Sequence, residues 1–162
     1  MFRALCVALL CALLSSLAHA CDAINVEVLP FTVASDYTRS ADELGGRVGL
    51  VEVKLTAKVS GCTAVVGYAN PVLRVASELR RNQCAFEHVL THENEHVRIY
   101  EEALRTLASR IEARSAEDLF KVASEEVLAV LPAHEAHDSP EEYATNATAC
   151  NGRIAKLVAA RY

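Results

Sequence analysis

The chain has 162 residues and a formal net charge of −5 at pH 7, with 21 acidic residues against 16 basic ones. No basic tract is present, so nucleic acid is not an expected partner. No internal repeat or low-complexity linker divides the chain, and we expect a single domain that is long enough to bury its own hydrophobic core.

The first twenty residues have the pattern of a secretory signal peptide. Arg3 gives a basic start, an apolar run follows from Ala4 to Leu17, and Ala18-His19-Ala20 fits a small-x-small cleavage site. The run is short for a membrane-spanning helix, and no later stretch approaches the ~20 apolar residues that such a helix needs. We therefore expect a signal peptide over 1–20 and one exported domain over 21–162, periplasmic or secreted, with no transmembrane segment.

Export changes the expected role of the cysteines, because disulfides form and persist in oxidising compartments. Four cysteines follow the signal peptide, namely Cys21, Cys62, Cys84 and Cys150. They can form two disulfides, in three possible pairings. We favour Cys84 with Cys150, which would tie the start of a long helix to the last helix. A lipoprotein anchored through Cys21 is the alternative, although the residues before Cys21 match a lipobox poorly.

Before residue 80 the hydrophobic pattern has the period of two that is typical of half-buried strands. Ile24, Val26 and Val28 alternate with polar residues, and a clean alternation follows from Val51 to Val59. Ser60-Gly61 is a turn signal, so 63–68 is expected to return as a hairpin partner; 72–79 is a further strand or the approach to a helix. A capping-box pattern over 40–43 predicts a short helical turn.

After residue 80 the pattern predicts three helices. The first runs from about Gln83 to Ala113, and a second starts near Ser115 and ends after Leu131, because Pro132 follows. Ser139-Pro140 supplies an N-cap serine and a proline at the first helical position, which opens a third helix toward the C-terminus. The expected fold class is α+β, with N-terminal antiparallel strands followed by three helices.

The first long helix carries the sequence His92-Glu93-Asn94-Glu95-His96, an HExxH motif. Residues four apart share one helix face, so His92 and His96 can bind one zinc ion with Glu93 beside it. Zinc with an open coordination position lowers the pKa of a bound water toward ~7, and Glu93 is the expected general base. The alternative HxxEH order would use Glu95, but the chain is too short for the distant third ligand of that class.

The third ligand is expected in the segment 134–138. If the first two helices form an antiparallel hairpin that turns near Ser115, their equal rise of ~1.5 Å per residue places this segment opposite the motif. We favour His134, then His137, with Asp138 as a carboxylate ligand or as a hydrogen-bond partner of a ligand histidine.

Other polar residues are weaker candidates. Glu102 has the third-ligand spacing of another zincin class, but Ile99 replaces the glycine of its turn, so Glu102 is expected to point away. His88 is too far along the helix axis to share an ion with His96 and is expected to be structural. Tyr100 and Tyr143 are candidate donors to an oxyanion. Several glutamates are also available as ligands but are expected to solvate helix faces: Glu112, Glu117, Glu125 and Glu126.

Through His92-Glu93-x-x-His96 the chain resembles the zincin metallopeptidases. It also resembles a small bacterial family of predicted secreted zinc-dependent proteases, on the basis of an N-terminal strand region, Cys84 before the motif helix, and the later segment 134–138. This resemblance implies a zinc site and a peptidase-like fold.

These patterns predict an exported zinc metallopeptidase that hydrolyses peptide bonds in a peptide or protein substrate. The alternative is a non-catalytic periplasmic protein that binds a metal or a partner. A fourth protein ligand would favour the alternative, whereas an open position beside Glu93 would favour the enzyme. An interaction domain without metal is a third interpretation, and it requires the grouping of histidines to be accidental.

Overall fold

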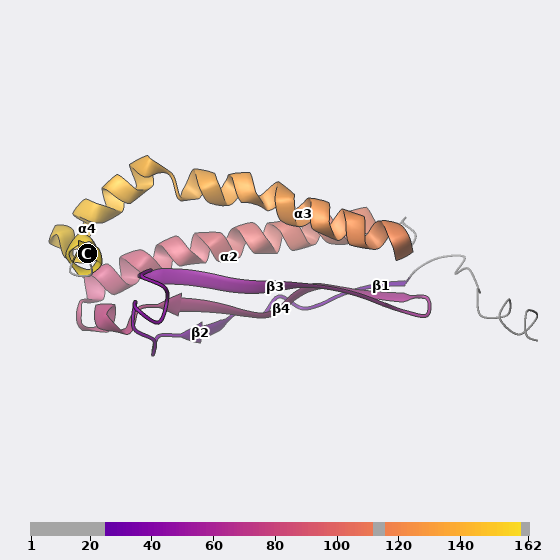
Figure 1. Ribbon diagram of the computed structural model, residues 1–162, viewed down its shortest axis with the longest axis horizontal. Coiled ribbons are helices and arrows are strands. Elements are labelled where there is room, and N and C mark those ends of the chain that lie inside the picture. Colours follow the sequence, from indigo (N-terminus) through magenta and orange to yellow (C-terminus); the bar gives the residue numbers. More distant parts are fainter. Residues whose placement is uncertain (1–24, 112–115, 160–162) are drawn as a thin grey trace, which may run out of the picture.

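The computed structural model describes residues 25–111 and 116–159. The predicted signal peptide and Cys21 lie outside these residues. The elements in chain order are β1 (Asn25–Val28), β2 (Ala34–Asp36), β3 (Gly49–Ser60), β4 (Thr63–Val75), a 3-10 helix η2 (Ser77–Arg81), α2 (Gln83–Ile111), α3 (Ala116–His137) and α4 (Pro140–Ala159). Helices α2 and α3 run along the long β3–β4 hairpin, and α4 lies at one end of an elongated molecule (Figure 1). The fold is α+β, and none of the described helices is both long and apolar enough to cross a membrane.

The β3–β4 hairpin confirms the predicted turn at Ser60-Gly61. The two strands pair antiparallel from Ser60 with Thr63 to Gly49 with Val75, with one irregularity between Glu52 and Lys54. Strand β4 therefore continues well beyond the expected 63–68 and reaches the 3-10 helix before α2. This extension matters for function because it places the start of β3 beside the first turns of α2.

The expectation of antiparallel N-terminal strands is wrong for β1 and β2, which both pair parallel with β4. β1 pairs with the first part of β4 and β2 with the last part, on the edge opposite β3. The chain reverses direction between β2 and β3, and again between β3 and β4. Strand β4 therefore runs in the same direction as β1 and β2, and it lies between them and β3. The buried Arg74 on β4 links three strands, because it forms ion pairs with Asp36 on β2 and Glu52 on β3.

The predicted helices form, but α3 does not end before Pro132, and the predicted C-terminal helix is interrupted at 149–152. Helix α3 continues through Pro132 to His137. A proline inside a helix lacks the N–H that would bond the carbonyl four residues earlier. Here that residue is Leu128, which is 63% exposed, so water can satisfy the free carbonyl. The predicted helix start after residue 138 is confirmed, because the backbone N–H of Glu142 donates to the Ser139 hydroxyl over 3.2 Å.

Helix α4 has two halves. The backbone leaves helical geometry from Ala149 to Gly152, where Cys150, Asn151 and Gly152 have positive φ. At this break Cys150 is bonded to Cys84 at the start of α2, with a Cα–Cα distance of 5.7 Å, which confirms the favoured disulfide. Cys62 is also disulfide-bonded. The Cys84–Cys150 bond fixes the second half of α4 against the N-terminal end of α2.

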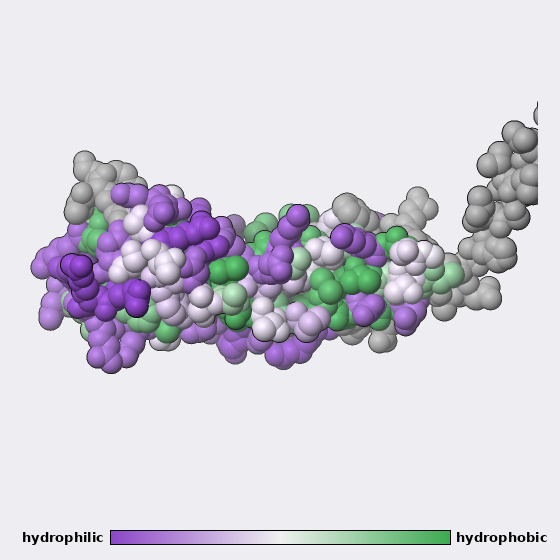
Figure 2. Space-filling view, turned by 90° about the horizontal axis from the view of Figure 1, so that it is seen from below, coloured by the Kyte–Doolittle hydropathy of each residue, from purple (hydrophilic) through white to green (hydrophobic). Residues whose placement is uncertain are grey.

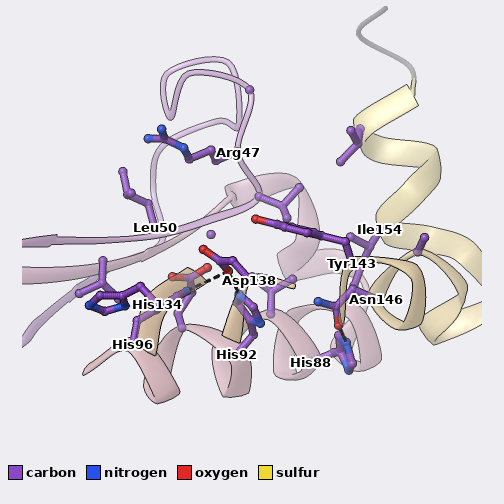
Figure 3. Close-up of a pocket in the computed structure, with 18 of the residues that line it drawn as sticks. Arg47, Leu50, His88, His92, His96, His134, Asp138, Tyr143, Asn146 and Ile154 are labelled. Carbon is purple, nitrogen blue, oxygen red and sulfur yellow. Dashed lines mark hydrogen bonds and ion pairs between the residues drawn. The ribbon is translucent and has the colours of Figure 1, made fainter. Parts of the chain in front are cut away.

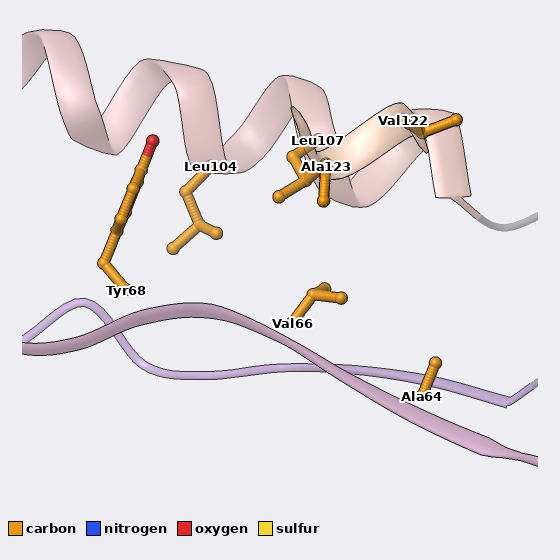
Figure 4. Close-up of a cluster of buried hydrophobic side chains, with 7 residues drawn as sticks. All are labelled: Ala64, Val66, Tyr68, Leu104, Leu107, Val122 and Ala123. Carbon is orange, nitrogen blue, oxygen red and sulfur yellow. The ribbon is translucent and has the colours of Figure 1, made fainter. Parts of the chain in front are cut away.

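Two hydrophobic clusters form most of the described core. The first fills the space between β4, α2 and α3 (Figure 4), and its buried residues are Ala64, Val66, Tyr68, Leu104, Leu107, Val122 and Ala123. The second lies nearer α4 and consists of Leu73, Val75, Leu79, Ala85, Val89 and Ile154. The motif residues 92–96 follow Val89 on α2, so this second cluster supports them from the N-terminal side.

The surface seen from below divides along the long axis of the molecule (Figure 2). Hydrophilic side chains dominate the end that holds β2 and α4, and hydrophobic ones gather toward β1. Val28, at the end of β1, is 36% exposed and lies with Phe31 and Leu104 around a small depression.

Candidate metal centre

The HExxH motif and the segment 134–138 lie face to face, as the helical hairpin predicted. The motif lies on α2, and the facing segment is the end of α3 and the residue after it. His96 Nδ1 is 2.7 Å from His134 Nδ1, and His92 Nε2 is 3.1 Å from Asp138 Oδ1. Two segments about 40 residues apart in the sequence therefore build one polar cluster (Figure 3).

Asp138 occupies the point toward which both motif histidines converge. Its Oδ1 atom lies 3.1 Å from His92 Nε2 and 3.2 Å from His96 Nε2. The histidine side chains are 12% and 11% exposed, whereas that of Asp138 is 36% exposed, so the carboxylate lies toward the open side of the cluster. Two imidazole nitrogens aimed at one carboxylate oxygen form a donor set that could hold a divalent metal ion.

His137 joins the cluster from the other side of His92. Its ring stacks on that of His92 with centroids 4.2 Å apart, and its Nε2 lies 3.1 Å from the backbone carbonyl oxygen of His92. Ligand atoms of His92, His96 and His137 all lie within 4.8 Å of one another, so these three histidines are close enough to bind a metal ion.

His134, the favoured third ligand, also reaches the cluster, but on the Nδ1 side of His96. Its ring packs against that of Tyr100 with centroids 4.5 Å apart. Among the described residues, His134 Nε2 and His92 Nδ1 are buried without a hydrogen-bond partner. Buried polar atoms normally have partners. His134 Nε2 therefore has unused capacity to bind a ligand, whereas His92 Nδ1 lies 3.9 Å from Glu142 Oε1.

Burial favours the neutral form of His92, His96 and His134. Desolvation lowers the pKa of His92, His134 and His96, in the last case to about 4. The neighbouring histidines lower these pKa values further, and the negative charge of Asp138 raises them in part. The neutral imidazole is the form that binds metal, so the cluster offers its ligand form at neutral pH.

Glu93 is buried beside the cluster, between α2 and the start of β3. It is 6% exposed, and burial, with a smaller contribution from Asp138, raises its pKa to about 8. The carboxyl group lies against the backbone of Gly49, where an added Cβ atom would come within 2.2 Å of Glu93 Oε1. The glycine thus provides the space for the carboxyl group. A carboxyl group with a raised pKa in a cavity is typical of a general acid or base.

A cavity of about 860 Å³ joins these groups, a size within the usual range of ligand sites. One wall is the start of β3 and the loop before it, a second is α2, and the third is formed by the end of α3 and by α4. Besides the metal cluster and Glu93, the lining residues include Arg47, Val48, Gly49, Val51, Val89, Tyr143, Asn146, Ile154, Ala155 and Val158. Sequence patterns did not single out Arg47, Gly49 or Asn146, because they lie outside the motif and carry no characteristic spacing.

The other polar residues that the sequence suggested lie partly at the cavity and partly away from it. Tyr100 and Tyr143 both line the cavity. His88 is hydrogen-bonded to Asn146 and is not among the three clustered histidines. Glu102 is exposed and binds Arg105 over 2.8 Å, which confirms that it points away from the motif. Glu125 is exposed near Lys121, and the side chains of the other helical glutamates named as candidate ligands lie outside the described residues.

Comparison with known proteins gives no relative for this chain. No family model matches it, and neither does a curated protein or a solved structure. The resemblance to zincin peptidases therefore rests on the motif residues alone.

Proposed function

We propose that the protein is an exported zinc-dependent metallopeptidase that uses His92 and His96 as zinc ligands and Glu93 as general base. One observation carries the proposal: the Nε2 atoms of both motif histidines face a single carboxylate oxygen, beside a buried glutamate, inside an open cavity. Export is supported by the pattern of the first twenty residues and by the Cys84–Cys150 disulfide, a bond typical of oxidising compartments.

The third ligand comes from the segment 134–138, and Asp138 is the residue that the geometry favours. Its oxygen faces both Nε2 atoms, whereas His134 contacts the opposite ring nitrogen of His96. His137 stacks on His92, and its Nε2 is occupied by a backbone carbonyl. His134 and His137 then orient the motif imidazoles, the usual role of residues around metal ligands.

Glu93 is suited to move a proton at this site. Zinc bound by such a set of ligands polarises a substrate carbonyl and lowers the pKa of a bound water. A positive charge near Glu93 would lower its pKa from about 8, so that the carboxylate form is present at neutral pH and can accept the proton of that water. The same carboxyl group can then give the proton to the leaving amine.

Metal analysis and hydrolysis assays on matched variants test this proposal. We expect about one zinc per chain in the purified protein, lost in His96→Ala and retained in His88→Ala, the control histidine that bonds Asn146. Glu93→Gln should keep zinc and lose peptide hydrolysis. Equal loss of zinc in the Glu93 and His96 variants would contradict the assigned roles.

A third-ligand series distinguishes the three candidates. His134→Ala and His137→Ala should each weaken zinc affinity by about 10-fold to 100-fold, as is typical of residues that orient metal ligands, and Asp138→Ala should weaken it more. A larger loss of zinc affinity in His134→Ala or His137→Ala than in Asp138→Ala would refute the Asp138 assignment. It would show that the third ligand is a histidine.

A non-catalytic metal-binding protein is the second candidate. The observation in its favour is the crowding of donors, because ligand atoms of His92, His96 and His137 lie within 4.8 Å of one another, and both His134 and Asp138 contact His96. Four of them bound at once would leave no position for water. Stoichiometric zinc with no hydrolysis in the wild-type protein, for any member of a diverse peptide mixture, would favour this candidate.

A further inference from the structure

The cavity is polar on one side and apolar on the other. The metal cluster and Glu93 form the polar side. The other side, here named the apolar chamber, is lined by Val48 and Val51 of β3 and its approach, Val89 of α2, and Ile154, Ala155 and Val158 of α4. We propose that the apolar chamber binds an aliphatic side chain of the peptide substrate, next to the bond that is cleaved. This inference deepens the proposed peptidase function and rests on it.

The chamber is directly continuous with the catalytic groups. Val89 lies one helical turn before Glu93 on α2, and residues four apart share one helix face. Val89 and Ile154 belong to the second hydrophobic cluster, and Val48 and Val51 pack against it. A substrate whose carbonyl reaches the motif histidines therefore lies next to the apolar residues that begin at Val89.

Two polar side chains that line the cavity outside the metal cluster are bonded to each other, and one basic side chain lies at its rim. His88 and Asn146 line the same cavity, but their side chains bond each other. Arg47 is exposed at the mouth and is the one lysine or arginine among the described residues that line the cavity. A charged side chain buried in the chamber would lose its hydration, and a basic one would also be repelled by Arg47.

The wall formed by α4 has a fixed position. Ile154, Ala155 and Val158 follow the break in α4, and the Cys84–Cys150 bond holds that break against α2. In Figure 3 Ile154 lies beside Tyr143, on the side of the cavity away from His96 and His134. The chamber is thus preformed, which reduces the ordering cost of binding a small apolar group.

Binding of blocked tripeptides to the zinc-loaded Glu93→Gln protein tests the inference without hydrolysis. Three probes differ only in the central residue, which is leucine, lysine or aspartate between two alanines. We expect the leucine probe to bind at least about tenfold more tightly than the other two, as burial of an aliphatic side chain implies. Equal affinity for the three probes would overturn the proposal.

Two substitutions in the chamber and one control on the same helix locate the effect. Ala155→Phe should fill the chamber and abolish the preference for leucine, whereas Ala144→Phe, at an exposed position outside the cavity, should retain it. Should Ala155→Phe fail to fold, Val158→Glu carries the test, because a carboxylate in the chamber should reverse the preference toward the lysine probe. An unchanged leucine preference in a folded chamber variant would overturn the proposal.

The outcome is separable from that of the proposed function. Cleavage of all three probes by the wild-type protein at similar rates would support the peptidase and refute the chamber. Selective binding of the leucine probe with no cleavage of any peptide would establish the chamber and refute the peptidase.

Discussion

Replacement of Glu93 by glutamine should make the stability of the metal-free protein much less sensitive to alkaline pH. The pKa of Glu93 is about 8 in the folded chain against an ordinary value of 4.5. A folded-state pKa above the unfolded-state value means that the folded chain holds the proton more tightly. Glu93 therefore contributes most to stability below about pH 4.5, and this contribution is lost as the pH rises toward 8. Glutamine has a similar shape and no such titration.

The size of the effect follows from the linkage relation. Between pH 5 and pH 8.5, the two pKa values correspond to a loss of about 4 kcal/mol in the free energy of unfolding. The pKa values of His92, His96 and His134 are lowered, so these groups add stability as the pH rises through about 6.5. Because both proteins share these histidines, the difference between wild type and Glu93→Gln isolates the glutamate.

Urea unfolding in the presence of a chelator measures this difference. Between pH 5 and pH 8.5, the free energy of unfolding of the variant relative to that of the wild type should rise by about 4 kcal/mol. The total stability of such a domain is roughly 5–15 kcal/mol. Added zinc should narrow the gap at pH 8.5, because a nearby cation stabilises the carboxylate form of Glu93. If the difference in unfolding free energy between the two proteins stayed constant within about 1 kcal/mol from pH 5 to pH 8.5, the raised pKa of a buried Glu93 would be refuted.

Three further predictions concern the surroundings of the site. Gly49→Ala should lower the rate of hydrolysis at least about tenfold at unchanged zinc content, because its Cβ atom would displace the Glu93 carboxyl group; parallel metal analysis and kinetics check this, and a fully active variant would contradict it. Replacing both Cys84 and Cys150 by serine should cost about 4 kcal/mol in urea unfolding, as expected for a loop of 66 residues; an unchanged midpoint would contradict the role given to the bond. Zinc affinity should fall by less than about tenfold between pH 7 and pH 5.5, because the low pKa of His96 limits proton competition; a steep loss near pH 6.5 in a competition titration would show ordinary histidines instead.

Local sequence signals predicted the helices and the position of the site. The motif fixed which face of α2 carries His92 and His96, and equal helix rise placed Asp138 opposite them. The incorrect helix end at Pro132 did not affect this prediction, because the register of the helical hairpin depends on where the chain turns. Helix α3 continues past Pro132 and brings its last residues opposite the motif.

The strand pairing and the walls of the cavity depend on contacts that are distant in the sequence. Nothing in the alternation of apolar residues determines which edge β1 and β2 will meet, so the parallel pairing with β4 was not predicted. Gly49 supplies space instead of a chemical group, and its role becomes visible only when the position of Glu93 is known.

The central position of β4 has a consequence for how the chain acquires its fold. β4 is the last strand in the sequence, yet the two strands nearest the N-terminus pair only with it among the described residues, as in the contact of Asn25 with Thr63. In a chain that emerges N-terminus first from a ribosome or a translocation channel, β1 and β2 are therefore delivered before their partner exists. Because the β3–β4 hairpin is local in the sequence, we expect it to form first and the earlier strands to dock later on its open edge, as the slow, long-range step of sheet assembly.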